Sequence, residues 1–235
     1  MKIFSVKGIS VTASFRVPET HTFQQTLPLP PKTTIIGIIG AALGLKLENA
    51  HKYTNDNEIL VGICGIHKGY MRDLWKYRKI KAKGGIGSVL IREYICYNEF
   101  DIYFASDKID LTELKYAIYS PVYPLTAGNS DDLIKVAKIS DIFTVQKEKL
   151  YRFENMVLPG DVTGSYKCDI DLSKIPITKA IYCPQVFILP TRFDFKEGKE
   201  RKIAKKDLFT FVDTPIVLES PIDGYIVEGR GIVLI

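Results

Sequence analysis

A glycine-containing helix behind a proline-rich approach is the feature that most restricts how this 235-residue chain can fold. The run from Thr26 to Gly44 reads TLPLPPKTTIIGIIGAALG. Prolines hold the approach extended, because each fixes its own φ and restricts the residue before it. The apolar residues that follow recur at helical spacing, which predicts a helix over residues 33–46 with Thr33 or Thr34 as its cap.

Three glycines within that run constrain what can pack on the helix. Gly37, Gly40 and Gly44 lie three and four residues apart and share much of one stripe. Each costs a helix roughly 1 kcal/mol relative to alanine. A helix that keeps all three is therefore expected to let another group approach its backbone closely. That group would be a sheet, another subunit or a ligand.

The rest of the chain reads as an α+β protein. The periodicity predicts, in chain order, strand 2–16, helix 33–46, strand 58–66, strand 88–106 with a turn near Asn98, helix 111–119, helix 131–138 and strand 141–146. Residues 47–57 read as a polar connection. The order β-α-β-β-α-β is the ferredoxin-like (RRM-like) arrangement. We expect a domain of this type over 1–150 and a smaller β-rich domain over 151–235.

A basic segment between the second and third predicted strands is the main candidate site. It holds one acid, Asp73, against seven cations, while the rest of the chain is close to neutral. The cations are Lys68, Arg72, Lys76, Arg78, Lys79, Lys81 and Lys83. Trp75 and Tyr77 lie among them, and glycines at 84, 85 and 87 predict the tip of a protruding hairpin. Cations neutralise phosphates and aromatic rings stack on unpaired bases, so this pattern favours RNA. The alternative is a solvated charged loop whose aromatic rings pack on the body.

Several classes of protein are disfavoured. The four cysteines are scattered without metal-ligand spacing, which predicts reduced, buried or semi-buried thiols and no metal site. We also expect no cofactor. The longest apolar stretch, Ile35 to Leu45, is too short to span a bilayer, and the N-terminus does not read as a signal peptide. We therefore expect a cytoplasmic protein with no membrane contact.

A set of runs in fixed order resembles a known family. The helix run contributes Lys32, Thr33, Ile35, Gly37, Gly40, Ala41, Leu43 and Gly44. TASFRVPETHTFQQ precedes it, and PVYPLTAGNSDD, ILPTRFDF and the terminal DGYIVEGRGIVLI follow. Together they resemble the Cas5 family, the RAMP-type RNA-binding subunits of type I CRISPR interference (Cascade) complexes. The likeness is greatest to type I-A and I-B members.

That resemblance implies a role in antiviral defence. A member of the family would bind the 5′ handle of the crRNA and cap one end of a backbone of Cas7 subunits. It would also contact the Cascade large subunit and, through the complex, target DNA. The basic segment would grip the handle, although some of its cations would instead touch the target strand or a neighbouring subunit.

The start of the glycine-containing helix is a second candidate RNA contact. A helix N-terminus offers free N–H groups to a phosphate, and Lys32, Thr33 and Thr34 would add a charge and hydroxyl donors. Ordinary capping by one threonine is the alternative. Arg16, at the end of the first strand, is a further candidate, with a surface ion pair as its alternative. The full set of candidate RNA-binding residues is Arg16, Lys32, Thr33, Thr34, Lys68, Arg72, Trp75, Lys76, Tyr77, Arg78, Lys79, Lys81 and Lys83.

Other segments read in more than one way. Gly128, Asn129 and Ser130 would form either a tight turn against RNA or a cap for the helix at 131–138. The mixed charges of residues 196–207 fit a solvated hairpin tip. Arg230 is expected in a hairpin turn.

We expect a protein that is not an enzyme. One branch of the family, in type I-C systems, cuts pre-crRNA without metal, which requires a general base and a general acid. His67, Lys68 and Tyr70 are the residues that could supply them here. The alternative function is therefore a metal-independent endoribonuclease. A general single-stranded RNA-binding domain without an assembly role is a third hypothesis.

Overall fold

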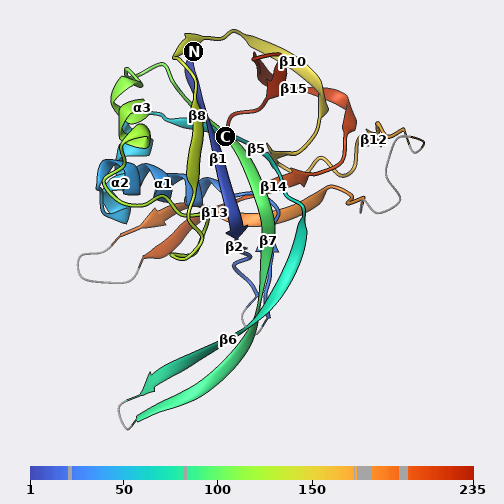
Figure 1. The fold of residues 1–235 in the computed structure, drawn as a ribbon. Coiled ribbons are helices and arrows are strands. Elements are labelled where there is room, and N and C mark those ends of the chain that lie inside the picture. The colour runs from blue at the N-terminus through green and yellow to red at the C-terminus, as the bar shows by residue number, and fades with distance from the viewer. Residues whose placement is uncertain (21–22, 82–83, 172, 174–180, 196–200) are drawn as a thin grey trace.

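The computed structural model describes residues 1–20, 23–81, 84–171, 173, 181–195 and 201–235 (Figure 1). Within these residues the chain is mostly strand, with helices on one side. The helices are α1 Lys32–Leu43, α2 Leu47–Asp56 and α3 Thr112–Tyr119. The strands are β1 Lys2–Ala13, β2 Phe15–Arg16, β3 Phe23–Gln24, β4 Thr26–Leu27, β5 Leu60–Ile66, β6 Gly69–Lys81, β7 Gly84–Ser106, β8 Lys135–Ile139, β9 Phe143–Thr144, β10 Lys147–Phe153, β11 Met156–Pro159, β12 Tyr166–Cys168, β13 Gln185–Asp194, β14 Lys202–Val212, β15 Ile216–Val227 and β16 Arg230–Ile232.

A large sheet organises the molecule. Its strand order is β13-β14-β11-β5-β7-β1-β8, and each neighbouring pair along this path is antiparallel. Strands from before and after residue 150 share this sheet, while β10, β15, β12 and β16 form a smaller one. The fold is therefore α+β, as expected, and the division into two domains at residue 150 stays a prediction.

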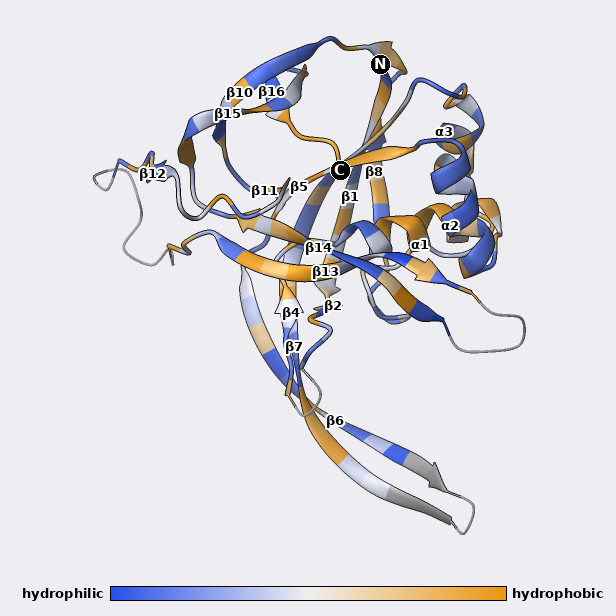
Figure 2. Cartoon of the chain, turned by 180° about the vertical axis from the view of Figure 1, so that it is seen from behind, coloured by the Kyte–Doolittle hydropathy of each residue, from blue (hydrophilic) through white to orange (hydrophobic). Residues whose placement is uncertain are grey.

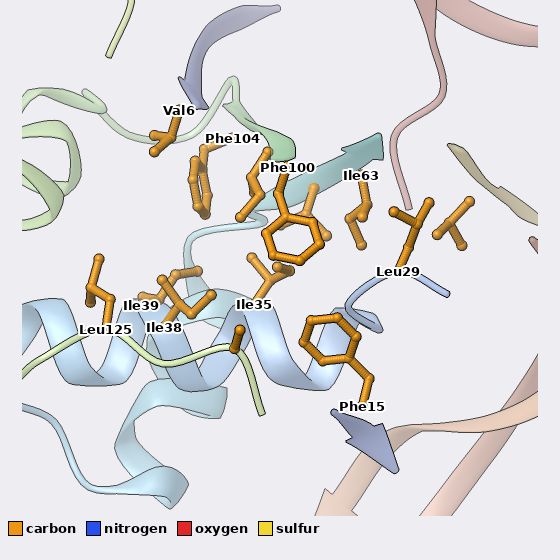
Figure 3. Close-up of a cluster of buried hydrophobic side chains, with 14 of the residues drawn as sticks. Val6, Phe15, Leu29, Ile35, Ile38, Ile39, Ile63, Phe100, Phe104 and Leu125 are labelled. Atoms are coloured by element: carbon orange, nitrogen blue, oxygen red, sulfur yellow. The ribbon is translucent and has the colours of Figure 1, made fainter. Parts of the chain in front are cut away.

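The two faces of the large sheet bury two different hydrophobic clusters. Successive side chains along a strand point to opposite faces. In β1, Phe4 therefore packs toward α1 and α3, with its ring stacked 5.2 Å from Phe104, whereas Ile3 belongs to the cluster under the smaller sheet. Figure 3 shows the helix-side cluster, where Ile35 and Ile39 of α1 face Phe100 of β7. The sheet is thus covered on both faces.

Helix α1 lies close to its predicted position, but its cap differs from the prediction. The N-cap residue is Pro31, and no side chain caps the helix, so neither Thr33 nor Thr34 acts as expected. Proline suits a helix start because its fixed φ is compatible with the turn. The helix ends at Gly44, which has φ 69° and closes the last turn through bonds to Gly40 and Ala41.

The three glycines of this run have different structural roles. Gly40 is buried against α2, where an added Cβ would lie 2.9 Å from the Ala50 Cβ. Gly44 is required by its left-handed backbone. Gly37 is exposed, with open space where its Cβ would be. The close approach expected from the sequence is therefore that of a second helix at Gly40.

Three local predictions were wrong. Residues 47–56 form α2 rather than a polar connection, because Ala50, His51 and Thr54 present a buried face to the rest of the molecule. Residues 135–139 form strand β8 rather than helix, because they pair with β1. The chain does not turn at Asn98, which is buried within β7 and donates from Nδ2 to the Ser10 carbonyl. Tertiary pairing overrides local propensity at each site.

Arg230 fastens the smaller sheet to the large one. It begins β16 rather than occupying a turn. One guanidinium nitrogen lies 3.4 Å from Asp101 Oδ2 of β7, and the other donates to the carbonyls of Glu154 and Asn155. This arginine therefore has a structural role.

The four cysteines are free thiols, and the expectation that all of them are buried or semi-buried is wrong for Cys168 and Cys183, which are exposed. Cys64 is buried, and burial raises the pKa of its thiol to about 12. None of the helices in the described residues is long and apolar enough to cross a lipid bilayer.

Replacing Gly40 should destabilise the fold through overpacking. The Cβ of a leucine there would press against the Ala50 Cβ and the Leu45 carbonyl oxygen. We therefore expect Gly40→Leu to lower the free energy of unfolding by about 1–3 kcal/mol. Gly37→Ala is the matched control and should raise it by up to about 1 kcal/mol, because nothing lies within 4 Å. Urea denaturation measures both. An unchanged midpoint for Gly40→Leu would contradict the close contact.

Acidification should weaken the fold through His51. This side chain is 4% exposed, its ring lies 5.2 Å from that of Phe193, and its Nε2 has no hydrogen-bond partner among the described residues. Burial, with Arg201 and Lys32 nearby, lowers the pKa of His51. The unfolded chain, with a histidine pKa near 6.5, then binds more protons, so stability should fall as the pH drops through about 6.5 toward the folded pKa.

The measurement is the free energy of unfolding of wild type and His51→Gln between about pH 7 and pH 5. The variant should lose less stability across this window than wild type. Burial also lowers the pKa of His67, so part of the slope should persist in the single variant. Identical slopes for the two proteins would refute this contribution.

Candidate nucleic-acid interface

The basic segment forms a long antiparallel hairpin. Strands β6 and β7 pair without interruption from Gly69↔Cys96 to Lys81↔Gly84. The hairpin projects from the body, while the remainder of β7 runs through the large sheet (Figure 1). At its root β3 joins the other side of β7, with Phe23 opposite Ile91. The predicted protruding hairpin is present.

Strand geometry places the cations Arg72, Lys76 and Arg78 of β6 on the opposite face from its aromatic residues Trp75 and Tyr77. Directly paired residues share a face, and neighbours along a strand alternate between faces. The first face, here called the cationic face, carries Arg72, Leu74, Lys76, Arg78, Val89 and Ile91. The second, the aromatic face, carries Met71, Trp75, Tyr77, Leu90, Arg92 and Tyr94. In Figure 2 the part of β6 nearer the tip is mostly hydrophilic and lies beside a more hydrophobic part of β7.

The cationic face combines charge with exposed aliphatic side chains. Arg72 Nε lies 3.6 Å from Glu93 Oε1, and its guanidinium lies over the Phe23 ring at 5.1 Å. Lys76 and Arg78 are exposed and make no ion pair with another described residue. Leu74 between them is 61% exposed. This face can therefore hold phosphates with the two unpaired cations.

The aromatic face is a packed stack. The Trp75 and Tyr77 rings lie 5.5 Å apart at 21°. The Arg92 guanidinium lies 5.2 Å from the Trp75 ring and 4.5 Å from the Tyr94 ring. Trp75 remains 41% exposed, so part of its ring is open to a ligand.

The other predicted cations of this segment are distributed differently. Lys68 is exposed at the root of the hairpin, with its Nζ 5.4 Å from the Tyr97 ring centroid. Lys79 and Lys81 belong to β6, but their side chains lie outside the described residues, as does Lys83 entirely.

A groove of about 560 Å³ lies at the start of α1. Thr33 and Thr34 line it together with Arg16 from β2, while their contact with RNA stays a prediction. Phe193 and Arg201, from the β13–β14 hairpin, line its other side. Arg16 is exposed, and its guanidinium donates a long 3.4 Å bond to the Thr20 carbonyl. The groove therefore brings two arginines to the helix N-terminus.

Lys32, the first residue of α1, has a different environment. It is half-buried, and burial lowers its pKa, with Asp207 and Lys205 nearby. Gly128 also borders the groove, where its backbone packs so closely on the Ser14 carbonyl that a Cβ would overlap it. Asn129 caps no helix; its Nδ2 donates to Asp132 Oδ2 within a turn.

The structure gathers only two of the three residues considered for catalysis. The His67 and Tyr70 rings lie 4.8 Å apart, and Tyr182 and Asp213 border the same small pocket. Burial lowers the pKa of His67 and raises that of Tyr70. Lys68 instead lies over Tyr97. The Lys68 amine therefore contacts Tyr97, whereas His67 contacts Tyr70.

Sequence reasoning missed four residues of these surfaces. Arg92 and Tyr94 lie in the returning strand, whose alternation in VLIREYI already carried the signal of a shared face. Phe193 and Arg201 come from a distant hairpin, and no local pattern ties them to the start of α1.

Comparison with known proteins agrees with this architecture. Two solved structures resemble nearly the whole chain at low identity. "Crystal structure of a CRISPR protein from Archaeoglobus fulgidus" gives a TM-score of 0.56 at 10% identity, covering 99% of this chain and 98% of that one. "CRISPR RNA-guided surveillance complex" gives 0.54 at 12% identity, covering 93% and 91%. These likenesses concern the fold.

The family assignment comes from the sequence. No curated protein sequence matches this one. The sequence model of the family described as "CRISPR-associated protein (Cas_Cas5)" matches residues 10–166, which is more than half of the chain. The chain belongs to the Cas5 family of CRISPR-associated proteins.

Proposed function

We propose that this chain is a Cascade subunit that binds the 5′ handle of crRNA and caps one end of the Cas7 backbone. The observation that carries the proposal is the projecting β6–β7 hairpin, where Lys76 and Arg78 are exposed without ion-pair partners among the described residues. Membership of the Cas5 family and the likeness in fold to a chain of a CRISPR RNA-guided surveillance complex support it. The large subunit and, through the complex, target DNA would be further partners. The type I-A or I-B assignment stays a prediction.

The mechanism is positioning. Exposed cations of the hairpin hold phosphates, and aromatic rings hold unpaired bases. The groove at the start of α1 supplies a second anchor, because Arg16 and Arg201 line it beside the positive end of the helix dipole. We infer that the central strands β8-β1-β7-β5 and their helices form the ferredoxin-like arrangement, since their order in space and along the chain fits it.

We also propose that the chain does not cut RNA. Metal-free cleavage needs an acid and a base directed at one ribose–phosphate group. His67 and Tyr70 pack on each other beside Tyr182, and the Lys68 amine lies over another ring. The raised pKa of Tyr70 also makes this phenol a poorer proton donor.

Charge reversal on the hairpin tests RNA binding. Labelled repeat RNA should shift with the purified chain on a native gel, and the affinity should fall with salt. Lys76→Glu/Arg78→Glu should weaken binding and reduce the slope of log affinity against log salt by about 1.4. Lys167→Glu is the matched control, because Lys167 is exposed on β12 of the smaller sheet. Absence of a shift both alone and with copurified backbone subunits would overturn the proposal.

A denaturing gel tests for cleavage in the same incubation. With EDTA present, the repeat RNA should remain intact for wild type and for His67→Ala alike. A discrete cut that disappears in His67→Ala would make this chain the processing nuclease. Copurification with Cas7 subunits separates an assembly subunit from a general RNA-binding domain, which would purify alone.

A further inference from the structure

The aromatic face of the hairpin contains a continuous row of planar groups. Read from the tip toward the body, the order is Tyr77, Trp75, Arg92 and Tyr94. Neighbouring members lie 5.5, 5.2 and 4.5 Å apart between their centres. All four come from alternating positions, two on β6 and two on β7, so the strand pairing itself assembles the row.

The Arg92 side chain is largely buried within this row. Its side chain is 11% exposed, and its ion pair to Asp73 Oδ2 is long at 3.9 Å. Its Nε is buried without a hydrogen-bond partner among the described residues. A guanidinium is planar and stacks on aromatic rings, which an ammonium cannot do in the same way. The contacts of Arg92 therefore fix the Trp75 ring and leave little of its charge for a phosphate.

Trp75 remains partly exposed to solvent beside its contact with Arg92. It is 41% exposed, whereas Tyr94 behind it is 8% exposed. A ring that lies between Tyr77 and Arg92 loses little side-chain freedom when a ligand contacts the part of it that stays exposed. The exposed cations Lys76 and Arg78 lie on the opposite face of the hairpin.

We propose that the aromatic face is a stacking site for the unpaired bases of single-stranded RNA, with Arg92 as the positioning residue that holds Trp75. The cationic face contacts phosphates separately. This inference rests on the proposed RNA binding. It adds that the aromatic face contacts the bases and that Arg92 holds the Trp75 ring in position for them. The two faces then contribute to affinity through different physical terms, only one of which depends on salt.

Trp75 provides a site-specific readout, because it is the one tryptophan of the chain. The purified chain is titrated with an oligoadenylate RNA and with an abasic ribose-phosphate oligomer of equal length. Binding is followed by the anisotropy of the labelled oligomer, and stacking by quenching of Trp75 fluorescence. We expect both oligomers to bind, and quenching with the oligoadenylate alone.

Variants separate the positioning role from a charge effect. Arg92→Lys keeps the charge and should lower the oligoadenylate affinity about three- to ten-fold, reduce the quenching and leave the salt slope unchanged. Lys76→Ala should keep the quenching and lower the salt slope by about 0.7. Trp75→Leu, at a half-exposed position that the fold should tolerate, should lower oligoadenylate affinity by about ten-fold or more while leaving the abasic oligomer unaffected.

Each contrary result is decisive. Binding of the oligoadenylate without quenching would exclude stacking on Trp75 while leaving RNA binding intact. An Arg92→Lys variant with wild-type affinity and quenching would remove the positioning role. If neither oligomer binds at low salt, this inference fails, and the test on repeat RNA with copurified subunits decides the proposed function separately.

Discussion

The antiparallel pairing of β7 is the interaction on which the rest of the structure depends. This strand runs for 23 residues, so one continuous backbone serves as a central strand of the large sheet and as one arm of the hairpin. At its inner end β7 pairs with β1 and β5, and at its outer end with β6. The position of the hairpin relative to the core is therefore set by a single strand.

The same alternation of side chains produces different results at the two ends of β7. Within the body, both faces are covered, and alternation divides apolar residues between two clusters, with Phe104 toward the helices and Tyr103 toward the smaller sheet. In the hairpin, Leu74 and Trp75 stay 61% and 41% exposed on opposite faces. Alternation there sorts Lys76 and Arg78 from Trp75 and Tyr77, so charge and aromatic surface are offered in opposite directions.

Close packing of α1 positions the second candidate surface. Gly40 allows Ala50 of α2 to approach the helix backbone, and the isoleucines of α1 pack on the sheet. The N-terminus of α1 is held where β2 and the β13–β14 hairpin meet, which brings Arg16 and Arg201 to one groove. Residues that are 185 positions apart in sequence thereby share one electrostatic environment.

The sequence by itself determined the elements whose signal is local. The apolar spacing around Ile35 to Leu43 gave helix α1, the charge and tip glycines of residues 68–87 gave the hairpin, and the ordered motifs gave the Cas5 family. Only the tertiary structure decided the rest. Helix α2 and strand β8 depend on packing and pairing partners elsewhere in the chain, as does the Phe193 and Arg201 side of the groove. The contact of Arg92 with Trp75 depends on the register of β6 against β7. Local propensity is worth less than these long-range contacts, so the sequence pattern could not specify them.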